Sequence, residues 1–391
     1  MRRIVVISYT ETGRQLNRRL TDYFIQKKDV AFSVHCGKDG QAMPLKEGME
    51  ARVQDCGDVL RREWQRTTAF VFIGAMGIAV RYIAPLLESK LCDPAVLVLD
   101  EKGQFVIPIL SGHIGGGVAI ARELAGLLGA QAVITTATDV EAQFAVDVFA
   151  QNNHLWIENP ACIRNISVAL LRGMSVELWT GLPVERAVEE VPDEAAKQQE
   201  EQFGQTQGQY GIRGKRRIVL EGQSLSECAA AIAVELPQEE LAGLKQRYGA
   251  AQVCVLRARQ YILGVGCKKG KTAEELEDFL RQLCRRLHIE IWEIAAVASI
   301  DVKREEDGIW ELSRRLGASY EVFSAEELEQ VRASVSASAF VKETVGVDNV
   351  CERSAYCLAE RWASEYRLVS GKQAQNGMTM AIVQVKPRLV W

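Results

Sequence analysis

The stretch TAFVFIGAMGIAVRYIAPLL, residues 68–87, indicates the fold of this chain most clearly. It begins with apolar, strand-forming residues, turns at Gly74 and Gly77, and continues with apolar residues at helical spacing. A strand, a glycine turn and a helix form the repeating unit of a parallel α/β sheet. Because ligands of such sheets usually lie at the carboxyl ends of the strands, we expect the glycine turns to carry the site.

The same unit recurs on both sides of this stretch. The run RRIVVIS precedes a helical segment near the amino end, and FVIPIL precedes the glycine-rich loop SGHIGGG and another helix. A second series begins near residue 258 with YILGVGC, the turn KKGK and the helix TAEELEDFLRQLCRRL. We therefore predict a multi-domain α/β protein with mainly parallel sheets flanked by helices. The expected domains are 1–140 (α/β), 141–257 (variable, with a mobile insertion near 185–217) and 258–391 (a second α/β domain).

Composition limits the kind of partner. A net charge of −4 argues against nucleic acid, and no apolar run reaches membrane-spanning length. The ten cysteines form no CxxC pair, so we expect reduced thiols in a cytoplasmic protein, with no metal site.

Three strand–glycine–helix loops could bind an anion: residues 73–81, 111–117 and 264–272. Glycines let the backbone approach a ligand, and the following helix offers free N–H groups. The alternative is an ordinary α/β turn, which also needs glycine. None of the loops fits the dinucleotide fingerprint or the P-loop. The predicted binding residues are Gly74, Gly77, Arg81, Ser111, Gly112, Gly115, Gly116, Gly117, Gly264, Gly266, Lys268, Lys269, Gly270, Lys271, Asp301 and Lys303.

His113 is the predicted catalytic residue. It lies among glycines in the loop 111–117, where few side chains can shield it, and histidine exchanges protons near neutral pH. The alternative is a structural hydrogen bond to a neighbouring loop. We interpret the other histidines, His35, His154 and His288, as structural.

Several of these blocks together resemble one family. FIGAMGIAVRYIAPLL, VLDEKGQFVIPILSGHIGGGVAIARELA and TTATDV are similar to the amino-terminal region of the cobalt-precorrin-5A hydrolases, the CbiG family of cobalamin biosynthesis. LGVGCKKGKTAEEL, SIDVKREEDGIWELSRRLG, FSAEEL and VGVDNVCERSA resemble its carboxyl-terminal domain, and the blocks follow the family's order.

The resemblance implies hydrolysis of a lactone on ring A of a cobalt-bound tetrapyrrole. The bridging carbon then leaves as acetaldehyde during corrin ring contraction, which gives cobalt-precorrin-5B. It implies no cofactor besides the substrate's cobalt, a tetrapyrrole-binding domain at 258–391, and other enzymes of cobalamin biosynthesis as neighbours. From the residues we infer that His113 is the base and that the N–H groups of residues 115–117 are oxyanion donors. The alternatives are a tetrapyrrole carrier without chemistry and a nucleotide-binding enzyme.

Overall fold

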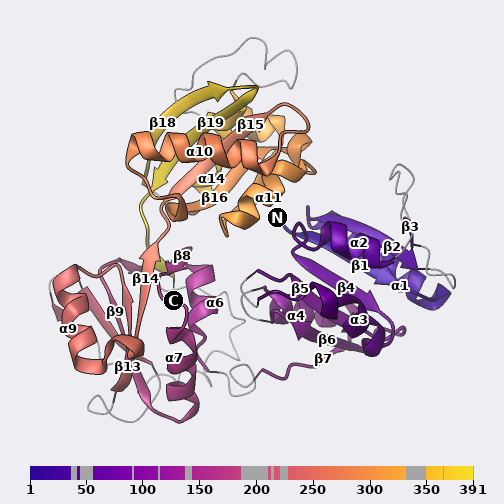
Figure 1. Cartoon of the computed structure of the whole chain (residues 1–391), viewed down its shortest axis with the longest axis horizontal. Helices are drawn as coiled ribbons and strands as arrows, with labels where there is room; N and C mark the ends of the chain where they lie inside the picture. Colours follow the sequence, from indigo (N-terminus) through magenta and orange to yellow (C-terminus); the bar gives the residue numbers. More distant parts are fainter. Residues whose placement is uncertain are drawn as a thin grey trace, which may run out of the picture. The chain divides into compact units, whose positions relative to one another are not determined.

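The described part of the protein contains three large sheets flanked by helices, which confirms the α/β prediction (Figure 1). Most strand pairs of the first sheet are parallel, whereas the other two sheets mix parallel and antiparallel pairs. The computed structural model describes residues 1–36, 42–44, 56–89, 92–112, 115–136, 143–185, 210–212, 215–220, 228–331, 349–363 and 365–390. Contacts divide the chain into two units. Unit 1 comprises Met1–Thr135, Tyr261–Trp362 and Tyr366–Gln384; unit 2 comprises Thr136–Gln260, Ala363–Glu365 and Val385–Trp391. The three domain ranges expected from the sequence stay a prediction.

The first sheet of unit 1 has the strand order β3-β2-β1-β4-β5-β6-β7. Its central strands β2, β1, β4 and β5 are parallel, whereas β6 runs antiparallel to β5 with Leu110 opposite Val96. The strands are β1 (Arg3–Ser8), β2 (Val30–Cys36), β3 (Ala42–Pro44), β4 (Ala69–Ile73), β5 (Ala95–Leu99), β6 (Phe105–Leu110) and β7 (Gln131–Ala132).

A tight turn causes the reversal at β6. Asp100 Oδ1 accepts hydrogen bonds from the backbone N–H groups of Gln104 and Phe105, at 2.7 and 2.8 Å. Gly103 has a φ of +66°, which a glycine adopts without strain. The loop that follows β6 therefore lies at the amino edge of the parallel strands. This corrects the expectation that residues 111–117 lie at the carboxyl edge.

Helices cover both faces of this sheet. Alternate residues of β1 point to opposite faces, so Ile4 and Val6 pack with α1 (Glu11–Gln26) and α4 (Gly117–Leu128). Val5 and Ile7 pack with α2 (Cys56–Glu63) and α3 (Met76–Ile83). A 3₁₀ turn, Ala84–Leu86, follows α3. The sheet is thus buried on both sides, as its continuous apolar strands predict.

The second sheet of unit 1 has the order β17-β16-β15-β19-β18. The apolar stripe of α10 packs on one face, and α14 contacts β15 and β16. The sequence spacing of Thr272 and Glu275 predicts a capping box at the start of α10, and the structure confirms it. The elements are β15 (Tyr261–Cys267), α10 (Ala273–Leu287), β16 (Ile294–Ile300), α11 (Asp307–Arg315), β17 (Ser319–Phe323), α12 (Ala325–Glu329), α14 (Val350–Trp362), β18 (Tyr366–Gln375) and β19 (Met378–Val385), with 3₁₀ turns at Ile291–Glu293 and Asp301–Lys303.

Unit 2 is built on a sheet with the order β11-β12-β9-β13-β14-β8. The pair β10 (Val184–Glu185) and β20 (Leu389–Val390) is separate. Of the insertion predicted near 185–217, residues 186–209 and 213–214 lie outside the described residues. The remaining elements are α6 (Val146–Asn152), β8 (Leu155–Ile157), α7 (Cys162–Leu171), β9 (Ser175–Thr180), β11 (Tyr210–Ile212), β12 (Lys215–Leu220), β13 (Cys228–Val234), α9 (Gln238–Tyr248), a 3₁₀ turn (Ala250–Gln252) and β14 (Val253–Ala258).

Replacing Gly264 with alanine tests how tightly α14 packs on β15. The new Cβ would lie 1.7 Å from the Cys351 carbonyl oxygen, so the helix must move. We expect the free energy of unfolding to fall by about 3 kcal/mol, measured by chemical denaturation. Gly126→Ala is the control, because this position in α4 has no atom within 4 Å and alanine favours a helix by about 1 kcal/mol. Equal stability of the two variants would contradict the packing role.

Candidate functional site

The carboxyl edge of the first sheet contains a topological switch point. From β1 the chain passes to β2 on one side, and it later returns to form β4 on the other side. Ligands of doubly wound sheets usually bind where the strand order reverses in this way. Gly74 lies here, with a φ of +151° and its N–H donating to the Leu99 carbonyl at 2.9 Å. Gly77 and Arg81 are exposed in the helix that follows.

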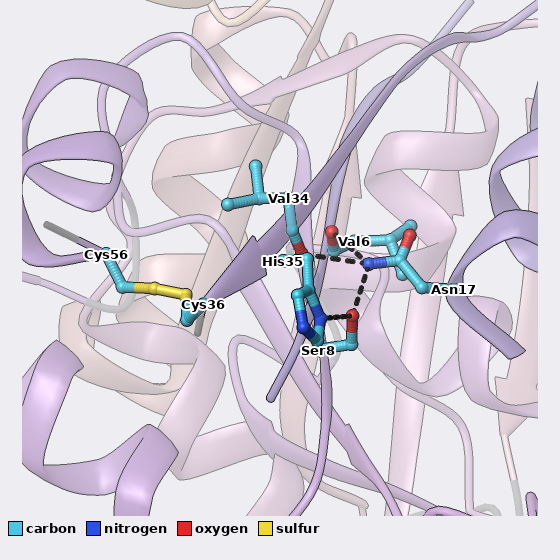
Figure 2. Close-up of a disulfide and its surroundings, with 7 residues drawn as sticks. All are labelled: Val6, Ser8, Asn17, Val34, His35, Cys36 and Cys56. Carbon is cyan, nitrogen blue, oxygen red and sulfur yellow. Dashed lines mark hydrogen bonds between the residues drawn. A yellow bond between two sulfur atoms is a disulfide. The ribbon is translucent and has the colours of Figure 1, made fainter. Parts of the chain in front are cut away.

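A buried polar network lies below this edge (Figure 2). Asn17 is fully buried, and its Nδ2 lies 3.0 Å from each of the Val6 carbonyl, the Val34 carbonyl and Ser8 Oγ. Its Oδ1 accepts hydrogen bonds from Thr21 and Ser33. One α1 side chain thus joins β1 to β2 at their carboxyl ends.

His35 belongs to the same network. Its Nδ1 lies 3.2 Å from Ser8 Oγ, and the residue is only 9% exposed. Burial lowers the pKa of His35 below its ordinary value, the charge of Arg14 lowers it further, and Glu11 acts in the opposite direction. Burial and the charge of Arg14 thus both disfavour the charged form of the imidazole. The sequence suggests only a structural role for His35. The structure places His35 opposite Ser8, the last residue of β1.

A disulfide lies next to His35. Cys36, near the end of β2, is bonded to Cys56 at the start of α2, and their Cα atoms are 6.2 Å apart (Figure 2). The expectation that all ten cysteines are reduced thiols is therefore wrong for this pair. The other eight cysteines form no disulfide.

The loop after β6 folds back on itself at the opposite edge. Ser111 Oγ donates to the Asp93 carbonyl at 3.0 Å. The N–H of Gly117 donates to the Ser111 carbonyl at 3.2 Å, and the N–H of Val118 donates to the Gly112 carbonyl at 2.9 Å. Gly117 is thus engaged and is not available as an oxyanion donor, which corrects that part of the prediction. His113 lies outside the described residues.

The backbone conformation of this loop explains why its other positions are glycine. A Cβ on Gly115 would lie 2.5 Å from the Ser111 Cβ, and Gly116 has a φ of +76° just before α4. A Cβ on Gly112 would lie 3.3 Å from the Val118 side chain. These glycines let the loop close tightly, whether or not a ligand binds there.

The predicted loop of the second sheet is shorter than expected. Gly264 and Gly266 are residues of β15; a Cβ on Gly266 would lie 2.6 Å from Thr379 Oγ1. Gly270 has a φ of +82°, and its N–H donates to Glu306 Oε1 at 2.7 Å. Packing against neighbouring elements therefore accounts for the two strand glycines, and the turn accounts for Gly270.

Some of the lysines at this loop are in ion pairs and others are not. Lys271 pairs with Glu275 at 2.6 Å, and Lys303 pairs with Glu306 at 2.8 Å. Lys268 and Lys269 are exposed and form no ion pair with any residue that the structure describes. Asp301 begins the 3₁₀ turn after β16, at the same carboxyl edge as Lys268.

The predicted binding residues thus form three groups. Gly74, Gly77 and Arg81 lie at the carboxyl edge of the first sheet, and residues 111, 112 and 115–117 lie at its amino edge. Residues 268–271, 301 and 303 lie at the carboxyl edge of the second sheet. A strand of about six residues is roughly 20 Å long, so one ligand arm cannot contact both edges of the first sheet.

The described residues contain neither a candidate metal site nor a candidate membrane span. Across the described ranges, no group of three or more His, Cys, Asp or Glu side chains has an arrangement that could hold a metal ion. None of the helices in these ranges has the length and apolar character needed to span a membrane.

Comparisons with known proteins identify relatives over most of the chain. Residues 58–139 match the family model "Cobalamin synthesis G N-terminal", and residues 261–383 match "Cobalamin synthesis G C-terminus". The chain is 32% identical to the cobalt-precorrin-5A hydrolase of Salmonella typhimurium, over 82% of this chain and 83% of the relative. It is 26% identical to that of Priestia megaterium, over 97% and 94%.

Solved structures of cobalamin biosynthesis proteins are also similar. A protein G homolog from Sulfolobus solfataricus has 22% identity and a TM-score of 0.38, covering 98% of this chain and 97% of its own. CobE has 27% identity and a TM-score of 0.31, covering 33% of this chain and 92% of its own. The resemblance seen in the sequence is confirmed by the two family models and the curated relatives: this chain belongs to the cobalt-precorrin-5A hydrolase family, CbiG.

Proposed function

We propose that this protein is a cobalt-precorrin-5A hydrolase. The observation that carries the proposal is 32% identity to a hydrolase of that name over 82% of the chain, together with both family domains. The proposed substrate is a cobalt-bound tetrapyrrole with a lactone on ring A. The proposed products are cobalt-precorrin-5B and acetaldehyde.

The reaction has two stages, and each of them needs a base. In the first, a base takes a proton from water, the resulting hydroxide attacks the lactone carbonyl, and the ring opens to a carboxylate and a hydroxyl on the bridging carbon. In the second, a base removes the hydroxyl proton, the carbon–carbon bond breaks, and its electron pair remains on the ring carbon, which is protonated. The bridging carbon and its methyl leave as acetaldehyde. His113 is the proposed base, with the N–H groups of Gly115 and Gly116 as oxyanion donors.

Positive charge near the second sheet supports a substrate with many carboxylate arms. Lys268 and Lys269 are exposed at the end of β15. Lys303 lies in the adjacent 3₁₀ turn, but it is already paired with Glu306, so the two exposed lysines carry this argument. Charged side chains that lack a fixed partner can pair with carboxylates at low cost, because no existing ion pair must break.

We further propose that the protein needs no cofactor of its own and that the cobalt belongs to the substrate. The proposed setting is the cytoplasm, with other enzymes of cobalamin biosynthesis as neighbours that deliver the substrate and accept the product. A tetrapyrrole carrier without chemistry is the alternative that the first experiment tests.

The purified full-length protein should release acetaldehyde from cobalt-precorrin-5A under anaerobic conditions. We expect one acetaldehyde per tetrapyrrole, trapped as a hydrazone, and the same yield after exhaustive treatment with a chelator. Tight binding of the substrate without acetaldehyde would identify a carrier instead. Loss of activity that added zinc restores would contradict the proposal that the protein has no metal of its own.

The variant His113→Asn should bind substrate but react slowly. Removal of a general base typically lowers the rate by about 10²- to 10⁴-fold, and single-turnover acetaldehyde formation measures this step. His288→Asn is the matched control, because His288 is exposed at the end of α10 with a φ of +55°, which asparagine tolerates. A rate within a few-fold of wild type would exclude His113 as the base.

Replacing Lys268 and Lys269 with glutamine should weaken substrate binding at low ionic strength. The loss should shrink at high salt, because exposed charges are screened. Adding Lys271→Gln should contribute less, since Lys271 is already paired with Glu275. Lys102→Gln, an exposed lysine in the turn before β6, is the control. Absorbance titrations measure the affinities, and unchanged affinity in the double variant at low salt would remove these lysines from the site.

A further inference from the structure

The structure defines the position and the hydrogen bond of His35, which lies at the switch point of the first sheet. It lies in β2 opposite Ser8, the last residue of β1, at the edge of the sheet opposite to the loop 111–117. Its side chain is therefore separated from that loop by about the length of a strand, roughly 20 Å. One ligand arm therefore cannot contact both His35 and the loop.

The hydrogen bonds fix the tautomer of His35. Asn17 Nδ2 can only donate, so it cannot accept the proton of the Ser8 hydroxyl. Ser8 is fully buried, and among the described residues the only acceptor within reach of its proton is His35 Nδ1, at 3.2 Å. If Nδ1 carried the proton instead, a buried hydroxyl would be left without an acceptor, at a cost of about 1–3 kcal/mol. The proton of the neutral ring is therefore on Nε2.

The Nε2–H group has no acceptor in the described part of the chain. No residue there forms a hydrogen bond with Nε2, and this atom is not among the enclosed polar atoms. The rest of the ring is held, since the residue is only 9% exposed. An N–H donor that is fixed on a mostly buried ring and has no acceptor among the described residues fits an anionic oxygen of a ligand.

Arg14 adds positive charge at the same edge, because it lies near the start of α1, which directly follows β1. It acts electrostatically on His35, and its Nε is buried without a hydrogen-bond partner among the described residues. Its only ion pair with a described residue is with Glu11, at 3.5 Å, where the carboxylate is 69% exposed. Such an exposed pair is worth little, so the guanidinium can turn to a ligand at low cost.

The neighbouring helix offers an apolar surface. Met76 and Val80, four residues apart in α3, are 40% and 47% exposed. They flank Gly77, where an added Cβ would have no other atom within 4 Å, and Arg81 follows. Apolar surface beside positive charge fits a ligand with a flat hydrocarbon ring and carboxylate arms.

We propose that the carboxyl edge of the first sheet is a carboxylate-binding site in which His35 Nε2–H and Arg14 hold an arm of a tetrapyrrole. The identity of the ligand as a tetrapyrrole rests on the proposed function; the carboxylate chemistry rests on His35 and Arg14. Ser8 is a positioning residue, because it acts on the ligand only by holding the proton of His35 on Nε2.

Equilibrium binding of uroporphyrin, a tetrapyrrole whose arms are acetates and propionates, tests this site in the full-length protein. We expect His35→Gln to weaken binding about 10-fold or more, the weight of one hydrogen bond to a charged group. Arg14→Gln should have a similar effect, and it does not disturb the buried network. His288→Gln, at an exposed position, should bind as the wild type does. Wild-type affinity in both His35→Gln and Arg14→Gln, or no binding of uroporphyrin by the wild type, would overturn the proposal.

Nitrogen-15 NMR of the imidazoles gives a second readout. With only four histidines in the chain, the His35 signals can be assigned from the His35→Gln variant. We expect a neutral ring with the proton on Nε2, a shift of that N–H when uroporphyrin binds, and a mixture of tautomers in Ser8→Ala. A proton on Nδ1 in the wild type would overturn the proposal. Acetaldehyde release separates the two proposals. If the enzyme is active but His35→Gln does not change the affinity for uroporphyrin, only this site is refuted. If binding depends on His35 but no acetaldehyde is released, only the proposed reaction is refuted.

Discussion

The turn capped by Asp100 determines which loops can share a ligand. Its carboxylate accepts three backbone hydrogen bonds, from residues 102, 104 and 105, and so reverses the chain between β5 and β6. A helical crossover at this point would have kept β6 parallel and placed the loop 111–117 beside Gly74. The short turn instead sends that loop to the amino edge. The first sheet therefore presents two separate polar edges.

The carboxyl edge is organised around a buried amide. Asn17 is fully buried in α1, yet its side chain contacts backbone carbonyls of both β1 and β2 as well as Ser8 and Ser33. A buried polar group that loses its hydrogen-bond partner lowers the stability of the fold by about 1–3 kcal/mol. Each member of the network therefore depends on the others being present. This explains why Ser8 and His35 are held in one arrangement. Precise placement of a polar side chain is what a binding site needs.

Glycines that look equivalent in the sequence are required for different physical reasons. Gly264 is required because the Cys351 carbonyl of α14 occupies the space of its side chain, whereas Gly270 is required by a φ of +82° in a turn. Close helix packing and turn geometry both require glycine, so the sequence alone does not distinguish them. Only the three-dimensional contacts separate these reasons from the close approach of a ligand.

The sequence by itself determined the α/β class, the capping box at Thr272 and the family, because each depends on local pattern or on matching order along the chain. It could not determine the direction of β6, since an apolar strand reads the same in a parallel and an antiparallel pair. It also could not reveal the pairing of Cys36 with Cys56 or the role of Ser8 beside His35. These contacts join residues 20 or more positions apart, and only the tertiary packing of β2 against β1 and α2 brings them together.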